Sequence, residues 1–121
     1  MSRQGILFVE HQGEIVGGGQ FSLLALMQHL KNYEPHCVTG GTGTMTAAVR
    51  ERDIAVEVIR MPAIRLSRIA AVWRCVWGVY RLAKKRNVVL LHANGSRCMF
   101  YAGLAAKFLR LPVCWHVRIN D

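Results

Sequence analysis

The sequence predicts an α/β fold in which helices cover both faces of a five-stranded parallel sheet with strand order 3-2-1-4-5. Two observations predict it. Short apolar runs alternate with segments of helical periodicity along the 121 residues, as expected for parallel strands joined by right-handed helical crossovers. The runs are also apolar at nearly every position, which indicates strands that are buried on both faces.

The elements follow in order from local patterns. The runs ILFVE, PHCVT, IAVEVI, VVLLH and PVCWH each have the length of a buried strand. The segments between them repeat apolar residues at helical spacing, with the turn GGTG starting one helix and Ser96 as the N-cap of another. The predicted elements are strand 6–10, helix 20–32, strand 35–39, helix 44–52, strand 54–59, helix 67–86, strand 88–92, helix 96–109 and strand 112–116.

A single Rossmann-like domain over residues 1–121, built as a three-layer sandwich, accounts for these elements. The opening MSRQG lacks the architecture of a secretory signal, so we expect a cytoplasmic protein. In a sheet of this order, ligands bind beyond the carboxyl ends of the strands where the strand order reverses, between the first and fourth strands. We therefore expect the glycine-rich loop after the first strand and the HANGS loop after the fourth to face each other.

Cysteine spacing and charge narrow the function classes. Cys37, Cys75, Cys98 and Cys114 form no Cys-x-x-Cys pair, which favours buried free thiols in a reducing compartment over a zinc or disulfide framework. Residues 1–60 carry five Lys/Arg and six Asp/Glu, whereas residues 61–121 carry eleven Lys/Arg and one acid, Asp121. This asymmetry predicts an anionic partner: nucleic acid, a membrane surface or a phosphorylated ligand.

The loop EHQGEIVGGGQ, between the first strand and the first helix, ends in Gly17, Gly18 and Gly19. A strand-to-helix turn that needs positive φ or tight packing would explain these glycines. An anion cradle would explain them too, because glycines let a phosphate approach the backbone and the following helix points free N–H groups at it. Both interpretations stay open on the residues alone.

Three familiar phosphate motifs are absent from the sequence. A dinucleotide fingerprint would follow its strand directly, but six residues intervene here and its last glycine would be Ser22. No Gly-Lys-Ser/Thr sequence is present for a Walker A loop. The third strand ends in VIR, without the aspartate of a phospho-receiver.

Three histidines, His11, His92 and His116, fall at or near the carboxyl ends of strands. Each of these histidines can be explained as an ordinary loop residue that makes hydrogen bonds. Contact with a sugar or phosphate, or proton transfer, is the functional alternative for an imidazole at this rim. The three share no local ligand spacing, so we expect no metal site.

The helix predicted over 67–86 has a basic face with Arg74, Arg81 and Lys85. A core-packing helix with a solvated basic face explains it, and attachment to anionic lipid headgroups is the alternative. Nucleic acid is not expected, because no recognised motif or basic–aromatic binding face is present. The apolar stripe predicted on the other side comprises Leu66, Ile69, Val72, Trp73, Val76, Trp77, Val79, Tyr80 and Ala83.

These residues resemble the retaining GT-B glycosyltransferases of family four. That family opens with an apolar strand, a polar loop, a Gly-Gly-x-Glu/Gln turn and an amphipathic helix, as in ILFVEHQGEIVGGGQFSLLALMQHL. The later stretch VVLLHANGSRCMFYAGLAAKFLRLPVCWHVRIND is similar as well, with strands that end at His92 and His116 and with Pro112-Val113 between them. The resemblance covers nearly the whole chain.

The resemblance implies an acceptor-side N-terminal domain whose C-terminal, donor-binding domain is absent here. It implies a nucleotide-sugar co-substrate, a glycan or lipid-linked acceptor, no metal or other cofactor, and no transfer by this domain alone. The uncovered interface predicts self-association, and the basic helix would serve at the inner face of the membrane. The alternative is a stand-alone α/β domain that binds a phosphate ligand or a partner without catalysis. The implied catalytic residue is His116, and the implied substrate or donor-diphosphate contacts are Gly17, Gly18, Gly19, Gln20, His92 and Asn94.

Overall fold

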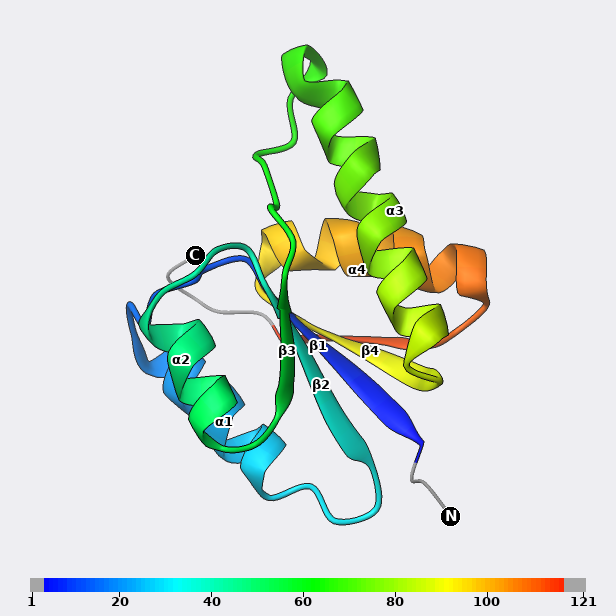
Figure 1. Cartoon of the computed structure of the whole chain (residues 1–121). Helices are drawn as coiled ribbons and strands as arrows, with labels where there is room; N and C mark the ends of the chain where they lie inside the picture. Colours follow the sequence, from blue (N-terminus) through cyan, green and yellow to red (C-terminus); the bar gives the residue numbers. More distant parts are fainter. Residues whose placement is uncertain (1–3, 117–121) are drawn as a thin grey trace.

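The computed structural model describes residues 4–116 and contains one five-stranded parallel sheet with strand order β3-β2-β1-β4-β5, as predicted (Figure 1). β1 lies at the centre, and all six of its residues are buried. The elements are β1 (Gly5–Glu10), α1 (Gly18–Gln28), β2 (Glu34–Thr39), α2 (Thr44–Glu51), β3 (Ala55–Val58), the 3₁₀ helix η1 (Leu66–Arg68), α3 (Ile69–Lys85), β4 (Val88–Asn94), α4 (Ser96–Leu109) and β5 (Val113–His116).

The sheet separates two apolar cores. Successive side chains of a strand point to opposite faces, so Phe8 packs with the α1 and α2 side, whereas Leu7 and Val9 pack with the α3 and α4 side. Figure 1 shows α1 and α2 on one side of the sheet and α3 and α4 on the other, which gives the predicted three layers. The N-terminal end of α3, with η1, projects beyond the other elements.

The bounds of α4 are as predicted, but the predicted end of the first helix and the predicted N-cap of α4 are wrong. α1 ends at Gln28, and not at residue 32, because the His29 N–H closes the last turn on the carbonyl groups of Ala25 and Leu26. Ser96 is the first residue of α4 and not its N-cap. Gly95 takes the N-cap position with φ of 108°, a left-handed conformation that glycine adopts at low cost.

The predicted stripe on α3 is buried only in part, since Leu66 and Ile69 at its N-terminal end are exposed and so are two of its aromatic residues. Val72, Val76 and Val79 are buried, but Trp73 is 49% exposed and Trp77 is 59% exposed. The stripe of nine residues is wider than the arc that the sheet and α4 cover, so its edge reaches solvent. Cys114 is also exposed, against the prediction that all four thiols are buried, and it lies on the edge strand β5.

Within residues 4–116, no helix combines the length and the apolar character that a membrane crossing requires.

Candidate functional site

The glycine turn, Gly17–Gly19, lies at the start of α1, at the end of the loop that follows β1. Gly17 is the N-cap of α1 in extended backbone, with φ of −176°, a conformation open to any residue. A Cβ atom on Gly17 or Gly18 would meet nothing within 4 Å. Neither positive φ nor tight packing within the described chain therefore explains these two glycines. The space beside them is open to a group from outside the chain.

Close packing instead explains glycines in the neighbouring loops. A Cβ atom on Gly13 would lie 2.4 Å from the Gly41 carbonyl oxygen, and one on Gly40 would lie 2.1 Å from the His11 carbonyl oxygen. The β1–α1 and β2–α2 loops thus contact each other through backbone. This contact supports the loop that leads from β1 into the glycine turn.

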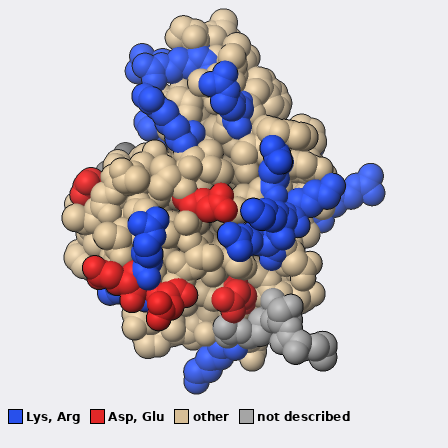
Figure 2. Space-filling view, viewed as in Figure 1, with Lys and Arg blue, Asp and Glu red and all other residues tan. Residues whose placement is uncertain are grey.

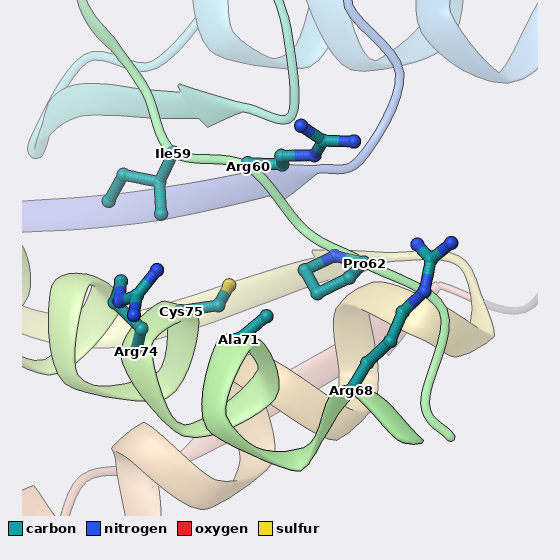
Figure 3. Close-up of a pocket in the computed structure, with 7 residues that line it drawn as sticks. All are labelled: Ile59, Arg60, Pro62, Arg68, Ala71, Arg74 and Cys75. Atoms are coloured by element: carbon teal, nitrogen blue, oxygen red, sulfur yellow. The ribbon is translucent and has the colours of Figure 1, made fainter. Parts of the chain in front are cut away.

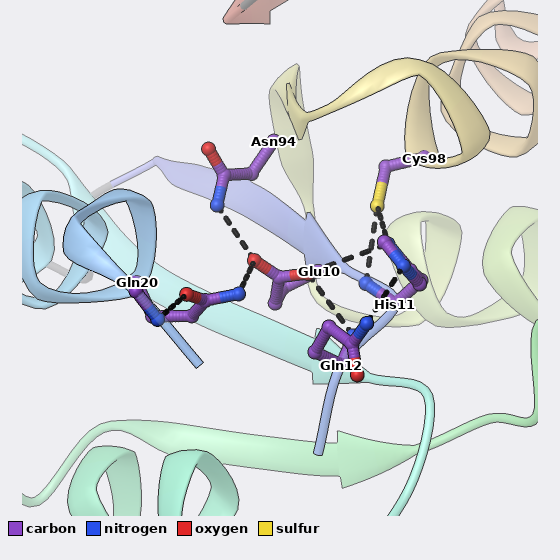
Figure 4. A network of polar contacts seen from close by, with 7 residues as sticks. Glu10, His11, Gln12, Gln20, Asn94 and Cys98 are labelled. Carbon is purple, nitrogen blue, oxygen red and sulfur yellow. Dashed lines mark hydrogen bonds and ion pairs between the residues drawn. The ribbon is translucent and has the colours of Figure 1, made fainter. Parts of the chain in front are cut away.

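A buried carboxylate, Glu10, organises the site at the end of β1 (Figure 4). Its Oε1 accepts hydrogen bonds from Asn94 Nδ2 at 2.7 Å and from Gln20 Nε2 at 3.2 Å. Its Oε2 accepts the Gln12 N–H at 3.0 Å. Elements far apart in the sequence, β1, α1 and β4, are therefore tied together through one side chain.

The same network fixes the glycine turn. The Gln20 Oε1 atom accepts the Gly17 N–H at 3.1 Å, which satisfies one of the free donors at the start of α1. On the other side of Glu10, the His11 N–H donates to Cys98 Sγ at 3.1 Å. The turn is therefore held in place by side chains that are themselves buried, while Gly17 and Gly18 stay exposed.

A small cavity of about 60 Å³ lies between the first turns of α1 and the ends of β4 and β5. The glycine turn and the HANGS loop face each other across it, as predicted. His92 and His116 lie close together there, with ring centroids 6.4 Å apart and an angle of 26° between the ring planes. The cavity is lined by Gly19, Ser22, Leu23, Leu26, His92, Asn94 and His116.

Four of the seven predicted site residues therefore share this cavity: Gly19, His92, Asn94 and His116. Gln20 is fully buried and reaches the site only through its hydrogen bonds. Its predicted contact with a ligand stays a prediction, and so do the roles of the other six. The cavity also includes Ser22 of α1, which the sequence analysis named only as the position where a dinucleotide fingerprint would have its last glycine.

Sequence interpretation also missed Glu10 as a site residue. The signal was present, because an acid closes an otherwise apolar strand in ILFVE. A carboxylate at the buried end of a central strand needs hydrogen-bond donors. The amide side chains of Gln20 and Asn94 were the available donors, but their approach to Glu10 depends on the tertiary fold.

Burial lowers the pKa of His92 below its ordinary value, and the neighbouring His116 lowers it further. His92 is therefore held neutral near pH 7, with one ring nitrogen as donor and one as acceptor. The unfolded chain binds this proton more readily than the folded one. Neutral His92 thus contributes stability that is complete above the unfolded pKa of roughly 6.5 and is lost as the pH falls below it.

We predict that replacing His116 by glutamine raises the pKa of His92, because it removes one of the two causes of the shift. A proton NMR titration of the His92 ring measures this directly. Whole-protein unfolding is less specific, since burial also lowers the pKa of His36 and acts in the same direction. An unchanged His92 titration in His116→Gln would show that the two rings do not interact electrostatically.

One group of side chains in the described part of the chain has the composition of a metal site. Ligand atoms of Glu10, His11 and Cys98 lie within 4.8 Å of one another. The Glu10 oxygens already accept three N–H groups, and Cys98 Sγ accepts another. We interpret the group as part of the hydrogen-bond network, and the expectation of no metal stays a prediction.

The fold and the site together define a class of protein: a Rossmann-like α/β domain with a glycine turn at the point where the strand order of its sheet reverses. The match to a family model makes the assignment specific. The model described as Glycosyltransferase Family 4 matches residues 16–120, and the chain belongs to that family. The predicted resemblance is therefore confirmed.

Solved structures agree in fold. MurG of Acinetobacter baumannii superposes with a TM-score of 0.73 at 20% identity, over 94% of this chain and 35% of that one. Anabaena Alr3699/HepE in complex with UDP superposes with a TM-score of 0.74 at 21% identity, over 93% of this chain and 29% of that one. A glycosyltransferase from Rickettsia africae ESF-5 superposes with a TM-score of 0.74 at 18% identity, over 95% of this chain and 30% of that one. This chain thus spans about a third of their length. No curated protein matched it in sequence.

Proposed function

We propose that this chain forms one wall of the active site of a glycosyltransferase that moves a sugar from a nucleotide-sugar donor to a glycan or lipid-linked acceptor. The observation that carries the proposal is the open space beside Gly17 and Gly18. Two exposed glycines that the chain's own packing does not require suit a backbone that a diphosphate approaches closely. Family membership and the UDP complex of the Anabaena protein support the same donor class.

Each site residue takes a role that fits its position. The backbone of Gly17, Gly18 and Gly19 faces the donor diphosphate at the N-terminus of α1, where the helix dipole favours negative charge. His116, exposed at the end of β5, contacts the transferred sugar and is the catalytic candidate. Neutral His92 lines the same cavity and orients a hydroxyl group. Gln20 and Asn94 hold these elements in place through Glu10.

We further propose that a second Rossmann-like domain supplies the other wall and most donor contacts, and that this domain alone transfers no sugar. The relatives support a larger protein, since this chain covers 35% of MurG and 29% of the Anabaena protein. No further cofactor enters the proposed reaction. A role in cell-envelope polysaccharide synthesis at the cytoplasmic face stays a prediction. Self-association of this chain stays a prediction, and a concentration-independent monomer mass would contradict it.

The test compares this chain alone with the same chain completed by a GT-B C-terminal domain, whether from its own gene or added as a separate polypeptide. Both are incubated with labelled nucleotide sugars and a membrane extract that contains acceptors. We expect labelled product only from the complete protein. If the completed protein transfers nothing and the chain alone binds a phosphate ligand, the stand-alone binding domain becomes the better account.

We also propose that α3 lies on an anionic membrane surface. Arg74, Arg81 and Lys85 are exposed on one side of the helix. Trp73 and Trp77 are half exposed beside them and line an apolar groove of about 490 Å³ with Tyr80 and Phe108. Tryptophan next to Lys/Arg is the combination that suits the headgroup region of a bilayer. Figure 2 shows Lys and Arg gathered over the α3 part of the molecule.

We predict that the triple substitution Arg74→Gln, Arg81→Gln and Lys85→Gln weakens binding to vesicles containing anionic lipid by about 100-fold, since each surface cation contributes about 1 kcal/mol. Sedimentation with phosphatidylglycerol-containing vesicles measures it, and neutral phosphatidylcholine vesicles are the control. Arg50→Gln, an exposed charge on α2 across the sheet, should change little. Equal binding of the wild-type chain to both vesicle types would contradict the electrostatic contact.

A further inference from the structure

A second pocket, of about 400 Å³, lies between the segment that follows β3 and the N-terminal half of α3 (Figure 3). Its volume falls in the range of small-molecule sites, roughly 300 to 1,000 Å³. Nothing in the proposed transfer reaction so far uses it. The pocket is lined by Ile59, Arg60, Pro62, Arg68, Ala71, Arg74 and Cys75.

Three arginines line this pocket. In Figure 3, Arg68 and Arg74 lie at opposite ends of it, with Ala71 and Cys75 between them, and Arg60 lies on the facing segment with its side chain directed away from Ala71 and Cys75. Arginine presents a planar set of donors that matches phosphate oxygens in a two-pronged contact. A pocket lined by three arginines therefore suits an anion with several oxygen atoms.

The part of the chain that the structure describes offers these arginines no counter-charge. Within residues 4–116, none of the three makes an ion pair or a side-chain hydrogen bond. The sequence holds no Asp or Glu between Glu57 and Asp121, and Glu57 already pairs with Arg86 at 3.4 Å. The charge of the pocket is therefore left for an external anion to neutralise.

The floor of the pocket strengthens such an interaction. Ile59, Pro62, Ala71 and Cys75 supply apolar surface, which lowers the local dielectric constant beside the guanidinium groups. Burial raises the pKa of the Cys75 thiol to about 12, so it stays protonated and adds no negative charge. The first turn of α3 also contains no acid. An anion that carries an apolar group would contact both the arginines and the apolar surface of the pocket.

We propose that this pocket binds the phosphate group of a phosphate or diphosphate ester through Arg60, Arg68 and Arg74. The phosphate comes either from a soluble ester or from a lipid. The pocket lies just past the carboxyl end of β3, on the sheet edge where β1 leads into the glycine turn. If the transferase function holds, the bound ester is the acceptor. That assignment rests on the proposed function, whereas phosphate binding does not.

The experiment uses this 121-residue chain at low ionic strength, with inorganic pyrophosphate, geranyl diphosphate and phosphatidic acid vesicles as probes. Calorimetry measures the two soluble probes and sedimentation measures the vesicles. The test variant is Arg68→Gln with Arg74→Gln. The matched control is Arg50→Gln with Lys107→Gln, which removes two exposed charges from α2 and α4, outside both the pocket and the proposed membrane face of α3. All four positions are exposed, so both variants should fold.

We expect the wild-type chain to bind the diphosphate probes, the pocket variant to lose about tenfold in affinity and the control to change less than twofold. Amide resonances of Ala71 and Cys75 should shift on binding, while that of Trp77 should not. A preference for pyrophosphate would identify a soluble ester, and a preference for geranyl diphosphate and vesicles a lipid. Equal losses in both variants, or no binding by the wild-type chain, would overturn the proposal even if sugar transfer is observed.

Discussion

Replacing Glu10 by alanine is expected to lower the free energy of unfolding by about 3 to 5 kcal/mol, the largest effect of any single polar substitution in this site. The carboxylate is fully buried and accepts three N–H groups. Its removal leaves the amides of Gln20 and Asn94 buried without their acceptor. Each unsatisfied buried donor costs about 1 to 3 kcal/mol, and the vacated volume adds to the loss.

Urea unfolding at constant pH measures this effect. Glu51→Ala, an exposed acid at the end of α2, is the control and should change stability by no more than about 0.5 kcal/mol. Glu10→Gln keeps the volume but turns one acceptor into a donor, so it should lie between wild type and Glu10→Ala. A Glu10→Ala protein as stable as the control would show that the network does not hold the turn in place.

The second large effect concerns activity and not stability. We expect Gly17→Ala with Gly18→Ala to reduce sugar transfer by the complete two-domain protein by about 100-fold. The added methyl groups would stand where the proposed diphosphate approaches, and a displacement of about 1 Å at reacting groups has that consequence. The fold should tolerate both, since a Cβ atom at either position meets nothing within 4 Å. Alanine at these positions should also add stability, because it restricts the unfolded chain.

Gly41→Ala is the matched control. Gly41 also has open space around its Cβ position and takes no positive φ, but it belongs to the β2–α2 loop. Initial transfer rates and unfolding curves of the three proteins separate a blocked site from a damaged fold. Full activity in the double variant would show that the open space beside the turn is not used by the donor.

The fold was predictable because the relevant signals are local. Buried parallel strands leave continuous apolar runs such as ILFV and VVLL, and glycine turns mark the helix starts. Strand order then follows from the rules of crossover connection, and it places the glycine turn opposite the HANGS loop. The cavity shared by Gly19, His92, Asn94 and His116 is a consequence of that topology.

The parts that were missed depend on which side chains meet across long sequence separations. Glu10 and Asn94 are 84 residues apart, and no local pattern specifies that their side chains make a hydrogen bond. A helical periodicity gives the direction of Trp73 and Trp77, but not how wide an arc the sheet and α4 cover, so their exposure was not predictable. The pocket around Arg68 and Arg74 likewise needs the segment after β3 to close it.

The central claim is that the turn Gly17–Gly19 faces the diphosphate of a nucleotide sugar in a cleft between two domains. A crystal structure of the complete two-domain protein with a nucleoside diphosphate sugar tests it most directly. The account predicts phosphate oxygens within about 3 Å of backbone N–H groups at the start of α1, and the sugar beside His116. A diphosphate bound elsewhere, with the glycine turn facing open solvent, would contradict it.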